Sequence, residues 1–425
     1  MPPTPPNTQG ARHGVLMTLT AAFLGWLLDG FELGLFPVVA RPALQDMLRD
    51  AVEGGVGIWM GRITAAFLVG AAFGGALFGW LGDRIGRVRA MAWSILCYSL
   101  FSAAGFWATE PWHLAFVRFI AALGMGGEWA LGVALVMESW PDRSRPWLAA
   151  AIGAASNLGM LLVGVVARFF PVTPESWRWL FLVGASPAVL TLVIRLWVPE
   201  SARWKEAAQS KDITNPTHAT APLSQLAAVF RPPWVSTTVL GIALSSVALI
   251  GTWGSVQWIP AWADQITGGK LPQAKADAQM VSSLLAAVGA VLGPLFLARL
   301  SRRLAYALLC AGSLAACVWL FRFPSPWGPL FLVKTGVTAF TTAAFYGFFP
   351  LYFPELYPTL MRATGQGICY NAGRLIAATG ALLSGQLVQY LGGYAQMGAM
   401  ITLVYILGIG LAWVAPETRG KPLPE

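Results

Sequence analysis

Twelve long apolar stretches recur along this 425-residue chain, and they constrain its fold more than any other feature. A helix needs about 20 apolar residues to cross the hydrocarbon core of a bilayer, and every stretch reaches about that length. The pattern therefore predicts an all-α membrane protein with twelve transmembrane helices. The stretches span residues 15–40, 56–81, 88–109, 112–137, 147–170, 177–198, 234–262, 279–299, 304–323, 327–352, 364–389 and 393–415.

Composition agrees with this class. Hydrophobic residues make up 56% of the chain and charged residues 11%, and the mean hydropathy is +0.61. A soluble globular chain of this length does not ordinarily show such values. The segment Met1 to Gly14 is polar and rich in proline, and it lacks the regions of a signal peptide, so we interpret it as a free tail. The four cysteines lack metal-ligand spacing, and we expect neither a metal nor a cofactor.

Lysine and arginine set the orientation. With the start of the chain inside, sixteen of them fall in inner connections and seven in outer ones, including Arg41, Arg168 and Lys275. The bias predicts that both termini are cytoplasmic. It also explains the net charge of +9, together with flanking anionic lipid, so no nucleic-acid partner is expected. The expected partners are the lipid bilayer, protons and a small organic molecule, and we expect a monomer.

The chain repeats itself across its midpoint. Segments 138–145 and 355–362 share Glu, Pro and Arg at the same spacing, and each follows an apolar stretch with a basic residue near its start. This ordered set indicates two six-helix halves with a site between them. The predicted organisation is a cytoplasmic tail (1–14), an N-terminal bundle (15–198), a cytoplasmic linker (199–233), a C-terminal bundle (234–415) and a second cytoplasmic tail (416–425).

Two carboxylates lie inside the first apolar stretch. Asp29 and Glu32 are three residues apart and so share one face of a helix. Each charge near the bilayer centre costs roughly 2.5 to 3.5 kcal/mol on insertion scales. Either one of them pairs with a basic residue to fix packing, or the pair faces a water-filled cavity and exchanges protons. We favour the second interpretation.

Several motifs resemble a known family. The loop Gly79 to Arg89 resembles the signature loop of the major facilitator superfamily of transporters, and Arg118 followed by Gly124 resembles its fourth-helix motif. Segments 199–204 and 416–420 resemble its sugar-porter-like branches. The resemblance covers essentially the whole chain. It implies two pseudo-symmetric six-helix bundles in a bacterial inner membrane.

Three further segments resemble one branch of that superfamily. Segments 29–32, 126–129 and 365–367 are similar to the organic-acid and sialate proton symporters. In proton-coupled relatives an acid of helix 1 faces an arginine of helix 4, which implies that Asp29 pairs with Arg118. Protonation would then release the arginine. Glu32 matches a second acid that is more often aspartate.

The resemblance also implies gates on the cytoplasmic side. In the signature loop, Gly86 permits a tight reversal and Asp83 can lie at a helix N-terminus, where a carboxylate is stabilised by roughly 0.3 to 1 kcal/mol. We interpret the loop as a latch, although its arginines alone would also suit a plain topology signal. The second-half counterpart, 293–303, has Leu297 in place of the aspartate, which predicts a degenerate latch. The gating residues are Gly79, Asp83, Arg84, Gly86, Arg87, Glu138 paired with Arg145, and Glu355 paired with Arg362.

Further ionisable residues lie at depth. Glu128 is a third acid, which either joins Asp29, Glu32 and Arg118 in proton coupling or packs against Arg62 or Arg374. A cationic cavity suits a carboxylate, because arginine binds carboxylates with two hydrogen bonds. The candidate substrate-binding residues are Arg118, Gln257, Trp258, Lys334, Tyr346, Asn371 and Arg374. Trp253, Trp258 and Trp262 could equally form an interfacial belt.

Other classes fit less well. An enzyme would need a nucleophile with a base or a metal site, yet His13, His113 and His218 all fall in tails or loops. A channel would not need paired halves with a latch. Exporters of the superfamily often carry Gly-Pro in helix 5, where this chain has no proline. The sequence therefore predicts a proton-coupled symporter that imports a carboxylate, with sugar or polyol symport and proton-driven export as alternatives.

Overall fold

The computed structural model describes residues 8–48, 53–139, 145–186, 188–189, 200, 228–297, 299–357 and 359–419. Within these ranges the chain consists of helices, 3-10 segments and turns, and it contains no strand. This confirms the predicted all-α class. Most of the predicted linker 199–233 lies outside the described residues, and α1 already begins at Thr8, within the predicted tail.

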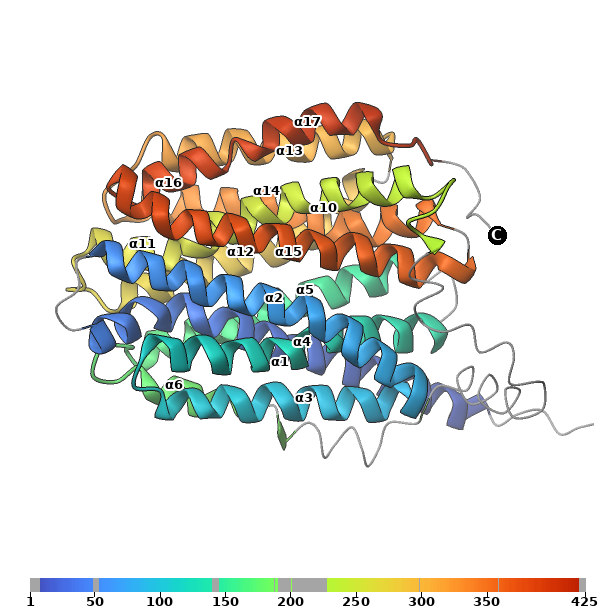
Figure 1. Cartoon of the computed structure of the whole chain (residues 1–425), viewed down its shortest axis with the longest axis horizontal. Helices are drawn as coiled ribbons and strands as arrows, with labels where there is room; N and C mark the ends of the chain where they lie inside the picture. Colours follow the sequence, from blue (N-terminus) through green and yellow to red (C-terminus); the bar gives the residue numbers. More distant parts are fainter. Residues whose placement is uncertain are drawn as a thin grey trace, which may run out of the picture.

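Within the described residues the helices follow the predicted apolar stretches and extend beyond many of them (Figure 1), while residues 187 and 190–198 of the sixth stretch lie outside the described part. The first half contains α1 (Thr8–Leu48), α2 (Glu53–Ile85), α3 (Arg87–Ala104), η1 (Gly105–Trp107), α4 (Pro111–Ser139), α5 (Arg145–Phe169) and α6 (Arg178–Val183). The second half contains α10 (Val235–Gly254), η4 (Val256–Trp258), α11 (Ile259–Ile266), α12 (Gln273–Leu297), α13 (Arg302–Phe321), α14 (Pro329–Tyr352), η5 (Phe353–Leu356), α15 (Thr359–Leu391), α16 (Tyr394–Ile401) and α17 (Val404–Val414).

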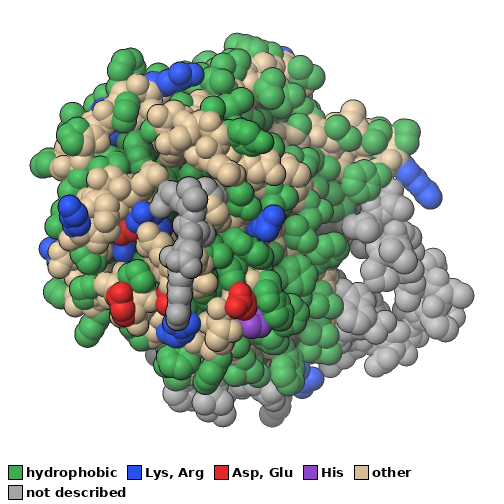
Figure 2. Space-filling model, turned by 60° about the vertical axis from the view of Figure 1, so that its left-hand side comes forward, with side chains coloured by type: hydrophobic (Ala, Val, Ile, Leu, Met, Phe, Trp, Pro, Cys, Tyr) green, Lys and Arg blue, Asp and Glu red, His purple; other side chains and the backbone are tan. Residues whose placement is uncertain are grey.

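The outer surface of the helices is apolar. Seven spans among the described helices are long and apolar enough to cross a membrane. Large hydrophobic side chains such as Phe73, Trp93, Phe116 and Leu407 are more than half exposed. Figure 2 shows hydrophobic side chains over most of the visible face, with few charged ones. A surface of this kind is stable against lipid and not against water, so the protein is a multi-pass integral membrane protein.

Glycine brings neighbouring helices close together. A Cβ atom added to Gly126 would lie 1.9 Å from the Ala71 carbonyl oxygen, at the packing of α4 on α2. One added to Gly289 would lie 2.1 Å from the Phe340 carbonyl oxygen, where α12 packs on α14. Small residues allow two helices to come this close. The resulting van der Waals contacts favour association of the helices, which the hydrophobic effect does not drive inside lipid.

The two bundles meet along two helix pairs. α2 packs against α15, as Figure 1 shows, and α5 packs against α12. We call the end of the molecule that holds the start of α1 and the end of α17 the terminal end, and the end that holds α11 and the turn between α15 and α16 the far end. The interface between the bundles runs from one end to the other and contains the candidate site.

Candidate functional site

A buried ion pair joins α1 to α4. Arg118 donates from Nη1 to Oε1 of Glu32, and the two side chains are 2% and 0% exposed. The hydroxyl of Ser102 on α3 donates to Oε2 of Glu32 at 2.6 Å. The Arg118 guanidinium also lies over the rings of Phe36 and Phe67, 5.5 and 4.8 Å from their centroids. The pair is therefore held from both sides.

The prediction that Arg118 pairs with Asp29 is thus wrong, since its partner is Glu32. The two acids share one face of α1 but differ by three residues, or about 4.5 Å along the helix axis. Glu32 is the one that lies level with Arg118, and its longer side chain reaches the guanidinium.

Asp29 instead lies where the first bundle meets the second, within range of charges from both. It is partly buried, and its Oδ1 has no hydrogen-bond partner among the described residues. The charges of Arg374 on α15 and of Glu32 act on it. The Arg374 guanidinium stacks over the Tyr370 ring at 4.9 Å and donates to Oδ1 of Asn371 at 3.5 Å. An acid of the first bundle and a cation of the second thus interact across the interface.

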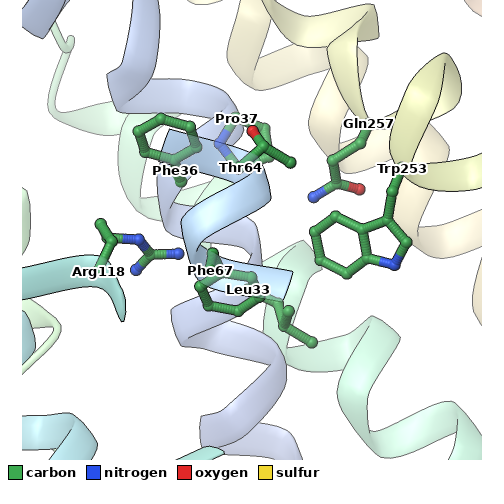
Figure 3. Close-up of a pocket in the computed structure, with 8 residues that line it drawn as sticks. All are labelled: Leu33, Phe36, Pro37, Thr64, Phe67, Arg118, Trp253 and Gln257. Carbon is green, nitrogen blue, oxygen red and sulfur yellow. The ribbon is translucent and has the colours of Figure 1, made fainter. Parts of the chain in front are cut away.

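A small pocket lies beside the ion pair, between the bundles. Figure 3 shows Arg118 on one side of it, and Trp253 and Gln257 on the other. The space inside it that a water-sized sphere can occupy is about 10 Å³, far below the roughly 300 to 1,000 Å³ of typical ligand pockets. A larger ligand would therefore require the bundles to move apart. The lining residues are Leu33, Phe36, Pro37, Thr64, Phe67, Arg118, Trp253 and Gln257.

Two predicted binding residues lie elsewhere. The ammonium group of Lys334 donates to the Phe323 carbonyl at 2.5 Å and to the Ser325 hydroxyl at 2.8 Å, both in the connection between α13 and α14. This engagement holds it away from the pocket. Trp258 is 2% exposed, and its indole N–H donates to the Trp253 carbonyl at 3.0 Å. Its ring belongs to the packed core, because the 3-10 turn η4 directs it away from the pocket that Trp253 and Gln257 line.

The other predicted residues of the second half lie near Arg374. The charge of Arg374 acts on Tyr346. Asn371 lies at the packing of α15 on α2, because a Cβ added to Gly75 would be 2.9 Å from its amide nitrogen. The structure therefore brings Tyr346, Asn371 and Arg374 into one region.

Glu128 has none of the predicted packing partners. It is 0% exposed, and neither of its carboxylate oxygens has a hydrogen bond of normal geometry in the described part of the chain, although the Tyr98 hydroxyl acts on it. Arg62 is exposed and stacks on Trp59 at 4.9 Å. Arg374 interacts with Asp29 instead.

At the terminal end of the first bundle, Gly86 has a φ of 104°, a conformation that favours glycine, and ends the loop before α3. Both carboxylate oxygens of Glu200 accept from the backbone N–H of Val88 at 3.2 Å. A carboxylate at a helix N-terminus is stabilised by the unpaired N–H groups there. The side chains of the remaining predicted gating residues, Asp83, Arg84, Arg87, Glu138, Arg145 and Arg362, and the surroundings of Gly79, lie outside the described residues.

The corresponding end of the second bundle holds an ion network. Arg302 donates to both oxygens of Glu355 at 2.8 and 2.7 Å, and the Thr418 hydroxyl donates to Glu355 at 2.6 Å. Glu417 accepts from the backbone N–H of Arg302 at 3.0 Å, at the start of α13. The latch predicted to be degenerate is therefore rich in contacts, because Glu355 and Glu417 supply the charge that Leu297 lacks. Glu355 pairs with Arg302, and its predicted pairing with Arg362 lies outside the described residues.

Glu417 lies beyond the end of α17. Partial burial raises the pKa of its carboxyl, but hydrogen bonds from the backbone N–H groups of Arg302, Arg419 and Arg303 outweigh this effect. The charge of Arg302 acts in the same direction, and the net pKa lies below the ordinary value.

Sequence reasoning missed a charged triad at the far end. Asp264 of α11 pairs with Arg41 of α1 through Oδ2 and accepts from Lys275 of α12 through Oδ1 at 3.0 Å. All three side chains are at most 8% exposed. Arg41 and Lys275 were assigned to the outer connections as topology charges. The available signal was Asp264, an acid directly after an apolar stretch.

Two helical bundles with an ionisable site between them are the organisation of many secondary transporters. The chain belongs to the major facilitator superfamily, whose family model matches residues 15–305.

Similar proteins and solved structures agree with this family assignment. A cis,cis-muconate transport protein of Acinetobacter baylyi is 28% identical over 98% of this chain and 98% of its own. A sialic acid transporter of Escherichia coli is 27% identical over 91% of this chain and 90% of its own. The xylose transporter of Escherichia coli, in an inward-open conformation, has the same fold, with a TM-score of 0.74 at 20% identity over 96% of this chain and 98% of that one. The protein is therefore a transporter of a small molecule and not an enzyme.

Proposed function

We propose that the protein is a proton-coupled symporter that imports a small organic anion with a carboxylate group. One observation carries the proposal. The charge of Arg374 of the second bundle acts on Asp29 of the first, and Arg374 has no ion-pair partner within 4 Å among the described residues. A guanidinium in this position can bind a carboxylate with two hydrogen bonds.

The position of Asp29 supplies the coupling. As a carboxylate, Asp29 competes with the substrate for the positive charge of Arg374. A proton on Asp29 removes this competition, so the proton and the anion bind cooperatively. A carrier loaded with one proton and one monoanion moves no net charge.

The relatives support the substrate class, since the muconate and sialic acid named for two of them are both carboxylates. The Lys and Arg distribution supports cytoplasmic termini, with the terminal end inside. The bacterial sources of these relatives support a location in a bacterial inner membrane.

Sugar symport is the second candidate. The pocket is lined by the amide of Gln257, the hydroxyl of Thr64 and the indole of Trp253, groups that suit a ligand rich in hydroxyls. One solved structure with this fold is a xylose transporter.

Uptake into proteoliposomes separates the candidates. An inward proton gradient is applied with labelled sialic acid, cis,cis-muconate or xylose, and the voltage is set with valinomycin. We expect uptake of an acid driven by the proton gradient. For the monoanion sialate it should be insensitive to voltage, which otherwise supplies about 2.3 kcal/mol per charge per 100 mV.

Variants identify the residues. Arg374→Gln should weaken binding of the acid roughly ten- to a hundredfold, since a hydrogen bond to a charged group contributes about 1.5 to 3 kcal/mol. Asp29→Asn should still exchange substrate but no longer accumulate it. Arg62→Gln is the matched control, because Arg62 is exposed and stacks on Trp59. Saturable xylose uptake that Arg374→Gln leaves unchanged would replace the carboxylate proposal with the sugar one.

A further inference from the structure

Several buried polar groups inside the first bundle have no hydrogen-bond partner among the described residues. Among them are the hydroxyl of Tyr98 on α3, both carboxylate oxygens of Glu128 on α4, and Oδ1 of Asp29 on α1. Tyr98 and Glu128 are both 0% exposed. A buried polar group without a partner is unfavourable, so several of them in one bundle are unusual for a purely structural core.

The contacts of the three helices fix the order of these groups along the bundle. A Cβ added to Gly25 of α1 would lie 2.0 Å from Oε1 of Glu128, so Glu128 is level with Gly25. Glu32 lies level with Ser102, its hydrogen-bond donor. Gly25 and Glu32 are seven residues apart, or about 10.5 Å along the axis of α1. Asp29 lies between these two levels.

Tyr98 occupies the same interval on the facing helix. It precedes Ser102 by four residues, about one helical turn, on the same face of α3. A Cβ added to Gly124 of α4 would lie 3.0 Å from the Tyr98 Cβ, so its ring starts between the Glu128 level and the Arg118 level. The negative charges of Glu128, Asp29 and Glu32 all act on the Tyr98 hydroxyl. Asp29 in turn acts on Glu128.

We propose that Tyr98 relays protons between Asp29 and Glu128. The inference rests on the proposed proton symport. In each transfer, protonated Asp29 gives its proton to the Tyr98 oxygen while the Tyr98 hydroxyl gives its own proton to the Glu128 carboxylate. Asp29 ends as a carboxylate, Glu128 as a carboxylic acid, and the tyrosine as a neutral phenol.

The relay gives the coupled proton a route that the substrate does not share. Asp29 interacts with Arg374 at the interface between the bundles, where the substrate is proposed to bind. Glu128 lies inside the first bundle, about a turn closer to the terminal end, since Gly25 precedes Asp29 by four residues. Transfer of the proton to Glu128 lets Asp29 become charged again and compete for Arg374, which favours release of the anion.

Tyr98→Phe tests the relay, because it keeps the ring and removes only the hydroxyl. Purified protein is reconstituted in proteoliposomes that contain a pH-sensitive dye. Two rates are measured with sialic acid and with cis,cis-muconate: exchange of labelled for unlabelled acid at equal pH, and net uptake with its proton flux. We expect exchange within about twofold of the parent, and net uptake and proton flux reduced at least tenfold. Glu128→Gln should show the same split, and the double variant should be no slower than either single one.

Ser99→Ala is the matched control, since the Ser99 hydroxyl is also buried without a described partner but is not among the groups proposed to transfer protons. It should match the parent in both rates. Equal losses of exchange and net uptake in Tyr98→Phe would assign the hydroxyl to packing and overturn the relay. If the parent couples protons to uptake and Tyr98→Phe shows the same proton flux, the relay is also overturned. If the parent moves no protons with either acid, the proposed symport itself fails, and the relay fails with it.

Discussion

Glu32 and Arg118 show how one buried side chain fixes the state of another. The carboxylate uses one oxygen for Arg118 and the other for Ser102, and the guanidinium lies over two phenylalanine rings. Removing two charges from water costs several kcal/mol per ion, so such a pair adds little net stability. Loss of one partner is nevertheless costly, because the other charge remains buried.

Glu32→Gln should therefore destabilise the protein by about 3 to 5 kcal/mol, the usual cost of a buried charge that has lost its partner. Ser102→Ala removes only one hydrogen bond to a charged group and should cost about 1.5 to 3 kcal/mol. Thermal unfolding in detergent, followed by tryptophan fluorescence, should rank the midpoints parent, Ser102→Ala, Glu32→Gln. A midpoint of Glu32→Gln equal to that of the parent would show that Glu32 does not compensate Arg118.

Helix α5 shows that glycine has two different roles within one element. A Cβ added to Gly159 would lie 1.8 Å from the Leu27 carbonyl oxygen of α1, whereas one added to Gly153 would meet nothing within 4 Å. The first glycine is needed for the approach of α5 to α1, which also carries Asp29 and Glu32. The second is not constrained by packing.

Gly159→Ala should push α5 away from α1 and destabilise the protein by about 1 to 3 kcal/mol or more, the usual cost of overpacking. Gly153→Ala should leave stability unchanged or raise it by up to about 1 kcal/mol, because alanine favours the helix. Unfolding midpoints and exchange rates in proteoliposomes would be compared for the two variants. Equal behaviour would mean that the α1–α5 contact does not limit the side chain at 159.

At the scale of the whole molecule, described ion pairs between the bundles lie at the far end. Arg41 of α1 pairs with Asp264 of α11, and Arg168 of α5 with Asp277 of α12 at 2.9 Å. The described ion pair at the terminal end, between Arg302 and Glu355, lies within the second bundle. Charge therefore links the two bundles at the far end in this state of the protein.

Asp264→Asn should open the far end, because Arg41 and Lys275 would lose their shared counter-charge and gain from contact with water. A change of about 3 kcal/mol would shift the ratio of closed to open molecules on the order of a hundredfold. Spin labels at Gln45 and Lys270 should then report longer distances by electron paramagnetic resonance.

Asp277→Asn is the control for this prediction. Arg168 and Asp277 are 43% and 32% exposed, and exposed pairs contribute little, so the label distance should stay close to that of the parent. An unchanged distance in Asp264→Asn as well would show that packing, and not the triad, closes the far end.

Much of the fold could be predicted from the sequence, because the length and polarity of an apolar stretch are local properties. They gave the all-α membrane class, and the repeated Glu, Pro and Arg positions indicated two halves. The cost of charge in lipid also indicated which charged residues need a compensating partner or a function inside the membrane: Asp29, Glu32, Arg118, Glu128 and Arg374. That cost applies to each residue wherever its neighbours lie, so these charged residues can be identified without knowledge of the tertiary structure.

The choice of partner was decided only by the tertiary structure. Whether Arg118 pairs with Asp29 or Glu32 depends on the rotation and axial offset of α1 relative to α4. The local sequence determines neither the rotation nor the offset. The same holds for Asp264, which joins residues from three helices. It also holds for Lys334, whose ammonium group turns to the connection before its own helix. The sequence by itself determined which side chains must be compensated inside the membrane, and the packing of the helices determined which groups compensate them, because contacts of a few ångströms depend on how whole helices are placed.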